Sequence, residues 1–155
     1  MKFGHIDIPE GHVVVKTANS FVFVNIRPFL RYHLLISPIR ITKTLRDMTE
    51  AETADLFNTG KVCMKALEFY AKDFTMTLQD GEAAGQTVPH VHIHLIPRLP
   101  NDLKVNNDIY RKGALECNYD DDDRVRLNRS FEEMSKEASY LREKFLPYFQ
   151  QDQFK

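Results

Sequence analysis

The stretch of the chain that decides the fold is a short run in which histidine occupies every second position: His90-Val91-His92-Ile93-His94-Leu95-Ile96. Successive side chains of a β-strand point to opposite faces of its sheet. A strand over 90–96 therefore places all three imidazoles on one face and the branched apolar residues on the other, where they suit a buried core. Because imidazole titrates near neutral pH, we expect the polar face to carry chemistry.

The length and composition of the chain predict a single domain over residues 1–155. The chain has 155 residues, of which 43% are apolar, and this is enough for one hydrophobic core. No apolar stretch is as long as a membrane span, and the first residues lack the apolar run of a signal peptide. We therefore expect a cytoplasmic protein that can also be nuclear, with no membrane partner.

Charge and cysteine usage narrow the class further. The 21 basic and 22 acidic residues give a net charge of −1, which argues against a nucleic-acid partner because nucleic-acid binders carry a basic patch. One positive pocket for a small anion remains compatible with this balance. Cys63 and Cys117 are far apart and have no metal-type spacing, so reduced thiols are expected.

The order of apolar segments and turn residues predicts an α+β fold with an antiparallel sheet of about five strands. Short turns separate the first three apolar segments, and such turns favour antiparallel neighbours. β-branched or alternating residues predict strands over 12–16, 21–26, 32–37, 74–79 and 90–96.

Two capping-box patterns predict where helices begin. Thr49 with Glu52 begins a long helix that runs to about residue 72, and Ser130 with Glu133 begins a C-terminal helix that ends near residue 147. Gly60 weakens the first helix but can permit close packing against the sheet. Between about 100 and 128 the signal is poor, so a mobile loop is expected, and the run 120–123 of four aspartates suits a solvated surface better than a cation site.

Three interpretations of the histidine run compete. A purely structural role suits one isolated histidine better than three in strict alternation. A zinc site meets a geometric obstacle, because positions 90 and 94 of a strand lie ~13 Å apart whereas zinc binds nitrogen at ~2 Å. Two of the histidines with His33 or Asp80 could still hold one ion.

The third interpretation is nucleophilic catalysis by the middle histidine. A neutral imidazole attacks phosphorus at neutral pH and forms a phosphoramidate that water later cleaves. His92 has an imidazole on each side of it on the same face, and these can supply a proton and bind a phosphate oxygen. The preceding Gly85-Gln86-Thr87-Val88 can turn backbone N–H groups and a hydroxyl toward an anion.

These residues resemble the signature of the histidine triad superfamily. Their surroundings resemble one branch of it, the fragile histidine triad proteins, which are bis(5'-adenosyl)-triphosphatases. Gln79-Asp80-Gly81, together with residues 85–88 and 107–110, points to this branch. The resemblance covers most of the chain, through 3–4, 21–25, 54–57, 78–81, 84–88, 90–98, 107–110 and 132–142.

The resemblance implies a histidine triad fold, a homodimer and hydrolysis of a small nucleotide, diadenosine triphosphate, to AMP and ADP. It implies no required cofactor and no protein-bound metal, although a divalent cation such as Mg or Mn can accompany the substrate. His92 would be the nucleophile, His90 and His94 would orient it and bind the α-phosphate, Gln79 would sit at the scissile bridge, and His33 would lie behind the triad. The implied substrate-binding residues are Asn25 at the ribose, Gly85, Gln86, Thr87 and Val88 at the phosphates, Phe3, Ile8, Phe23 and Leu35 around the adenine, and Arg98 and Tyr110.

The chain departs from the family pattern at one place near the site. The family usually has Pro-Gly-His before its third strand, whereas this chain has Arg31-Tyr32-His33. His5 and His12 match nothing in the family and are expected at the surface. The alternatives to the triphosphatase are a nucleoside phosphoramidase of the same superfamily, a nucleotide-binding signalling module with slow turnover, and a zinc protein.

Overall fold

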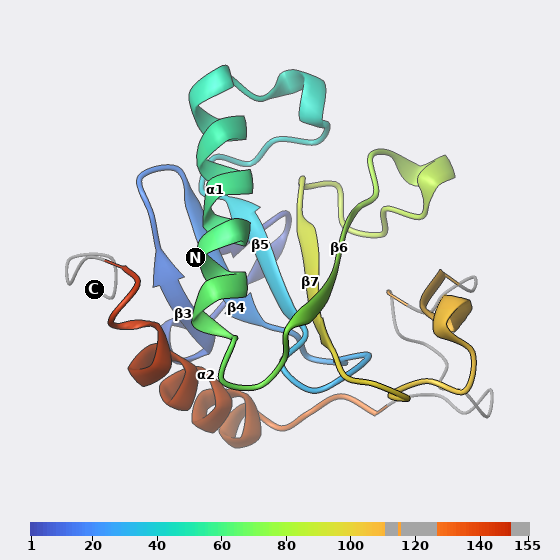
Figure 1. The fold of residues 1–155 in the computed structure, drawn as a ribbon. Coiled ribbons are helices and arrows are strands. Elements are labelled where there is room, and N and C mark those ends of the chain that lie inside the picture. Colours follow the sequence, from blue (N-terminus) through green and yellow to red (C-terminus); the bar gives the residue numbers. More distant parts are fainter. Residues whose placement is uncertain (111–114, 116–126, 150–155) are drawn as a thin grey trace.

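A five-stranded antiparallel sheet forms the centre of the molecule (Figure 1). The computed structural model describes residues 1–110, 115 and 127–149. Neighbouring strands follow the order β3-β4-β5-β7-β6, which confirms the predicted α+β fold and its sheet. The strands are β3 Val13–Lys16, β4 Ser20–Val24, β5 Leu34–Pro38, β6 Asp73–Leu78 and β7 Ile93–Arg98.

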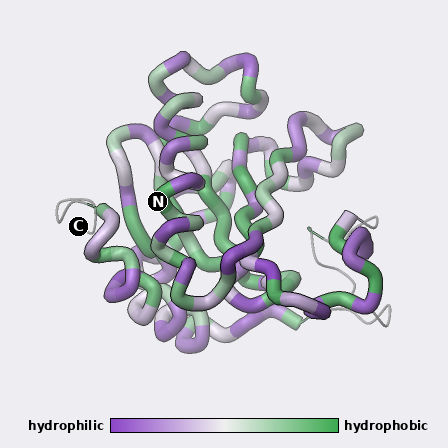
Figure 2. Tube along the Cα trace, viewed as in Figure 1, coloured by the Kyte–Doolittle hydropathy of each residue, from purple (hydrophilic) through white to green (hydrophobic). Residues whose placement is uncertain are grey.

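Both expected helices are present, and both begin with the predicted capping box. They are α1, Glu50–Ala66, capped by Thr49, and α2, Phe131–Phe145, capped by Ser130. The first helix ends six residues earlier than the sequence predicted, and residues 67–70 form turns instead. Both helices pack against the same face of the sheet, where their apolar residues join alternate residues of the strands in the main core. Figure 2 shows hydrophobic residues concentrated in the central strands, with hydrophilic residues recurring along the helices.

The predicted alternation of β7 holds, although its predicted start was wrong. Val91, Ile93 and Leu95 are buried in the main core under the helices. The ladder begins only at Ile93, because its register with β5 would place Pro38 opposite Val91, and proline has no N–H to donate. Instead the Ser37 hydroxyl donates to the Val91 carbonyl at 2.7 Å.

Gly60 lies where α1 comes close to the sheet, as its predicted packing role requires. A Cβ at this position would be 3.2 Å from the Met76 sulfur and 3.6 Å from Ile36 Cδ1. Cys63 is a buried free thiol on the same helix, and burial raises its pKa. Cys117 and the aspartates at 120–123 lie outside the described residues.

Several short elements were not predicted. A small hairpin, β1 Lys2–Phe3 and β2 Ile6–Asp7, turns at Gly4 with φ +58°. Short 3₁₀ helices form at Glu10–His12 (η1), Leu45–Asp47 (η2), Glu82–Ala84 (η3) and Asn106–Tyr110 (η4). The last of these lies in the segment predicted to be a mobile loop, and its Ile109 is buried against Ile96. No helix in the described part of the chain is long and apolar enough to cross a membrane.

Candidate functional site

The face of the sheet opposite the helices carries a pocket of about 350 Å³. Its apolar part is the second core cluster, which includes Phe3, Phe23 and Leu35, with Ile8 packed against it. All four line the pocket, as predicted for the residues around an adenine. Its polar part includes His92 and His94. A pocket of this size, apolar with a few polar groups at one end, is typical of small-ligand sites.

The apolar slot formed by Phe3, Ile8, Phe23 and Leu35 is in direct contact with the histidines. The Phe3 and Phe23 rings lie 5.2 Å apart, and the edge of the Phe3 ring meets His92 with centroids 5.0 Å apart. Phe3 reaches this position because the β1–β2 hairpin turns at Gly4, whose N–H donates to the His90 ring. A flat ring bound in the slot would therefore lie beside the imidazole of His92.

His92 presents an unprotonated nitrogen to the pocket. Its Nδ1 lies 2.8 Å from the backbone oxygen of His90. A carbonyl can only accept, so Nδ1 carries the proton and Nε2 keeps its lone pair. Burial lowers the pKa of His92, which keeps the ring neutral at pH 7. The strand places the lone pair of a neutral imidazole at the pocket, and this is the requirement for a nucleophile.

His94 is the group that can donate to a phosphate, and His33 sets its tautomer. The Phe29 N–H donates to His33 Nδ1 at 3.0 Å, so the His33 proton lies on Nε2, which donates to His94 Nδ1 at 2.9 Å. The His94 proton therefore lies on Nε2, which is buried without a hydrogen-bond partner among the described residues. Burial lowers the pKa of His94 well below its ordinary value, with smaller effects of His33 and His92. As predicted for the family, His33 lies behind the triad.

His90 lies where it can orient His92, as predicted, but its ring does not face a phosphate. Its Nδ1 accepts from the Gly4 N–H at 2.9 Å, and its Nε2 donates to the Arg40 carbonyl at 3.2 Å. Both ring nitrogens are therefore occupied, and the predicted phosphate contact is not supported. Burial lowers the pKa of this ring as well. His90 orients His92 through its own carbonyl and anchors the N-terminal hairpin.

The same contacts bear on the zinc interpretation. His90 cannot join a shared site without losing its backbone partners, and the two suggested additional ligands are also engaged. His33 donates to His94, while Asp80 accepts from the Leu45 N–H at 3.1 Å. Within the described ranges no group of three His, Cys, Asp or Glu side chains is arranged to hold a metal ion.

The loop before the triad brings only some of the predicted phosphate-binding residues to the pocket. Thr87 and Val88 line the pocket. Gln86 does not, because its side chain holds the loop together: it accepts from the Gly81 N–H at 2.9 Å and donates to the Lys43 carbonyl at 3.1 Å. Gly85 shapes the same loop with φ +93°.

Gln79 and Asn25 each have a side-chain polar atom that is available to a ligand. Gln79 follows Leu78, which pairs with Ile93, so it lies across from His92, and its buried Oε1 has no hydrogen-bond partner in the described structure. Asn25 lines the pocket and accepts from the Arg27 N–H at 2.9 Å. Its Nδ2 lies 3.4 Å from the protonated His33 Nε2, a contact of two donors, so Nδ2 is left to donate to a ligand hydroxyl.

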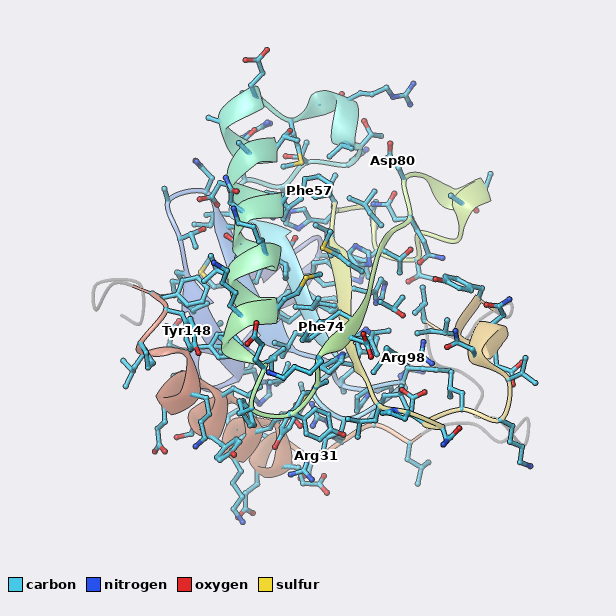
Figure 3. The ribbon with its side chains drawn as sticks, in the orientation of Figure 1. Arg31, Phe57, Phe74, Asp80, Arg98 and Tyr148 are labelled. Atoms are coloured by element: carbon cyan, nitrogen blue, oxygen red, sulfur yellow. The ribbon has the colours of Figure 1, made fainter. Side chains whose placement is uncertain are left out.

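Arg98 and Tyr110 are not brought to the pocket. Both line a separate cavity of about 640 Å³ at the other end of β7. Arg98 binds Asp102 through two hydrogen bonds of 2.7 and 2.8 Å and donates to Asn106 at 2.8 Å. Figure 3 shows Arg98 and Asp80 at opposite ends of the β6–β7 pair. The predicted substrate contacts of Arg98 and Tyr110 are therefore not supported, and Arg98 instead holds the segment after β7.

Although Tyr32 stands where the family usually has glycine, the turn before His33 still forms. The His33 N–H donates to the Leu30 carbonyl at 3.2 Å, which closes a four-residue turn with Tyr32 third. Tyr32 has φ +62°, a conformation that costs a side chain energy. Its buried ring packs against Tyr70 with centroids 4.8 Å apart, and the Arg31 guanidinium lies 4.8 Å from its centroid. These contacts offset the strain, so His33 is positioned without the glycine.

Sequence reasoning missed one histidine of the site. His12 was expected at the surface, but it is only 6% exposed and lines the pocket. It ends η1 and meets Phe131 at the start of α2, a contact between residues more than a hundred positions apart. No local pattern could reveal this burial. His5 is exposed, as expected.

Comparison with known proteins agrees with this geometry. The family model of the HIT domain matches residues 8–101. A bifunctional bis(5'-adenosyl)-triphosphatase/adenylylsulfatase from Arabidopsis thaliana is 40% identical over 150 residues, which cover 92% of this chain and 83% of that protein. A nitrilase and fragile histidine triad fusion protein from Caenorhabditis elegans is 44% identical over 144 residues, and this chain spans 32% of its length.

A solved structure extends the likeness to three dimensions. The diadenosine triphosphate hydrolase of Plasmodium falciparum, crystallised with cyclomarin A, superposes with a TM-score of 0.70 and 30% identity, covering 92% of this chain and 81% of that one. The resemblance seen in the sequence is confirmed. The chain belongs to the HIT domain family, and its relatives include fragile histidine triad proteins.

Proposed function

We propose that this protein is a hydrolase of dinucleoside polyphosphates that cleaves diadenosine triphosphate to AMP and ADP. The observation that carries the proposal is the lone pair of His92 Nε2 at a pocket whose apolar slot suits a base. The names of the relatives support it, since they include a bis(5'-adenosyl)-triphosphatase and a diadenosine triphosphate hydrolase.

In the first step His92 Nε2 attacks the α-phosphorus. The new bond joins nitrogen to phosphorus, and the bond from the α-phosphorus to the bridging oxygen breaks, so ADP leaves with that electron pair. His94 Nε2–H donates to a non-bridging oxygen, where negative charge develops. Gln79 lies across from His92, where its amide N–H donates to the bridging oxygen, since its Oε1 can only accept. Because the attacking ring keeps its Nδ1 proton, the His90 carbonyl stabilises the cation that forms.

In the second step water attacks the nucleotidyl-histidine. The new phosphorus–oxygen bond forms as the nitrogen–phosphorus bond breaks, AMP leaves, and the electron pair returns to Nε2. The water proton passes to solvent or to the departing products. Throughout, Phe3 and Phe23 hold the base, and Asn25 Nδ2 donates to a ribose hydroxyl.

Product analysis tests the reaction. Purified protein is given diadenosine triphosphate, diadenosine tetraphosphate and adenosine 5'-phosphoramidate, and the products are separated by chromatography. The triphosphate should give AMP and ADP in equal amounts at the highest kcat/KM. Preferred cleavage of the phosphoramidate would make the protein a phosphoramidase instead, and nanomolar binding with negligible turnover would favour a signalling module.

The covalent step has its own test. Protein quenched in alkali during turnover, where a phosphoramidate survives, should carry one nucleotidyl group on the peptide that contains His92, as mass spectrometry would show. Turnover without any labelled peptide would contradict the intermediate. Hydrolysis should persist in EDTA if a divalent ion only accompanies the substrate, and complete loss would assign the ion an essential role.

A homodimer is part of the same proposal. Phe57 on α1 and Met76 on β6 are each 38% exposed, and β6 is an edge strand of the sheet. Unpaired edges favour association, so a second copy is proposed to pair along β6. Analytical ultracentrifugation should give twice the chain mass of 18.1 kDa, and Met76→Glu should lower that mass. A monomer at all concentrations would contradict the pairing.

A further inference from the structure

His12 is a buried imidazole that the proposed reaction does not use. It ends η1 between Pro9 and β3, and it lines the same pocket as the base slot. The slot itself is made of Phe3, Ile8, Phe23 and Leu35, none of which offers a side-chain hydrogen bond. A bound base presents polar atoms along its edge, and some group of the pocket must meet them or leave them unpaired.

The position of His12 is held firmly by α2. Its ring lies 4.6 Å from the Phe131 ring, between centroids, and its Nε2 lies 3.2 Å from the Phe131 carbonyl. The backbone on both sides is tied to the same helix, because the Arg142 guanidinium donates to the carbonyls of Glu10, Gly11 and Val13 at 2.9–3.1 Å. His12 is therefore a fixed part of the wall.

The Phe131 contact also fixes which nitrogen carries the proton. A carbonyl only accepts, so Nε2 is protonated and donates, and Nδ1 of the neutral ring keeps its lone pair. Nδ1 has no hydrogen-bond partner in the described part of the chain. His12 lines the pocket, and its Nδ1 is therefore an acceptor nitrogen on a pocket residue that no described residue uses. Among the residues that the structure describes, the other charged or amide side chains that line the pocket are Asp7, which is paired with Lys2 at 2.8 Å, Asn25, and Arg27.

We propose that His12 selects the base of the substrate, with Nδ1 accepting a hydrogen bond from the exocyclic amino group of adenine. A 6-oxopurine such as hypoxanthine presents a carbonyl oxygen instead, which would face the His12 lone pair and leave both acceptors unsatisfied. The inference rests on the proposed function for the identity of the substrate. It adds a residue that discriminates between purines, which the apolar slot alone does not do.

Binding of mononucleotides tests this independently of hydrolysis. Isothermal calorimetry on the intact protein compares AMP with inosine monophosphate, which differ only at position 6 and its neighbour N1. The expected result is about tenfold tighter binding of AMP, the scale of one neutral hydrogen bond. In His12→Phe, which keeps a ring against Phe131 but has no acceptor, the ratio of the two dissociation constants should fall to about 1.

The control is Leu35→Ala, which opens the slot without touching a polar group. It should weaken both nucleotides by a similar factor and leave their ratio intact. A ratio that is unchanged in His12→Phe, or a wild type that does not distinguish AMP from inosine monophosphate, would overturn the role of His12. If instead the protein binds AMP selectively but cleaves no dinucleoside polyphosphate, His12 stands and the proposed function fails.

Circular dichroism shows whether His12→Phe folds. Should it not, ¹⁵N-histidine NMR of the wild type replaces it. AMP should shift the Nδ1 resonance of His12, while inosine monophosphate should shift it less. Equal shifts would contradict the proposal.

Discussion

The two faces of the sheet are built from the same strands and differ in how completely they are filled. On the helix-covered face, Ile93 and Leu95 are fully buried in one continuous core. On the opposite face, the alternate residues of the same segment border a pocket of about 350 Å³. There His94 Nε2 and, from the neighbouring strand end, Gln79 Oε1 are buried without partners among the described residues. One face uses its contacts for stability, and the other keeps polar groups available for a ligand.

This difference is sharpest between adjacent residues. His92 and Ile93 are neighbours in sequence, and their side chains lie on opposite faces. If the two faces are independent, a substitution at His92 should lower turnover, and a substitution at Ile93 should lower the stability of the fold.

The largest effect is expected for His92→Asn on the open face. The amide cannot form the phosphoramidate, so kcat should fall by about 10⁴ or more, the scale seen when a nucleophile is removed. The asparagine side chain introduced by this change is smaller than imidazole and polar, so nucleotide affinity and melting temperature should change little. Steady-state kinetics and calorimetry measure both. Turnover within tenfold of the wild type would end the assignment of the nucleophile.

The matching change on the covered face is Ile93→Ala. It removes buried methyl groups from the main core, so the free energy of unfolding should fall by about 2–5 kcal/mol. Urea denaturation measures this loss, and kcat per folded molecule should stay within a few fold of the wild type. If kcat fell as far as in His92→Asn, the two faces would not be independent.

The next effect concerns the hydrogen bond from His33 that fixes the tautomer of His94. His33→Phe removes the donor to His94 Nδ1, so the His94 proton is no longer held on Nε2. We expect kcat to fall by about 10- to 100-fold, because an oriented donor to the transition state is lost. His33→Gln retains an N–H donor and should recover part of the rate. Equal losses in the two variants would mean that His33 acts through packing alone.

Much of this architecture was predictable from local patterns. The alternation at 90–96 indicated the two faces, and the capping boxes indicated the start of both helices, because each depends on residues close together in sequence. The start of β7 was missed because it depends on Pro38, a residue of another strand that cannot donate.

The differences between the predicted and the observed surroundings of the site residues have the same origin. Gln86 and Arg98 were assigned to the substrate by resemblance, but one binds the Lys43 carbonyl and the other binds Asp102. His12 was assigned to the surface, although α2 buries it. Residue type and spacing indicate which groups can do chemistry. They do not show which groups already have a partner, since partners come from distant segments.

A smaller effect is expected in how folding stability and kcat/KM depend on pH. Burial lowers the pKa of His90, His92 and His94 in the folded protein. Below about pH 6.5 the unfolded chain takes up protons that the folded chain excludes, so stability should fall as the pH drops through this range. Attack needs unprotonated His92, so kcat/KM should remain high at pH values just below about 6.5, the ordinary pKa of histidine. An acid limb centred above that value would contradict a buried, neutral His92.

The smallest effect is expected on the covered face, from Gly60→Ala. Alanine favours a helix interior by about 1 kcal/mol over glycine, but its Cβ would lie 3.2 Å from the Met76 sulfur, a distance at which the neighbour must yield slightly. Met76 is flexible and partly exposed, so in a monomer its side chain can shift and the variant should melt a few degrees higher. If a second copy packs along β6, that copy restrains Met76, and the gain should shrink as protein concentration rises. Thermal melts at two concentrations distinguish these outcomes, and a loss of stability at both would show that the sheet face beneath α1 is packed too tightly to admit one methyl group.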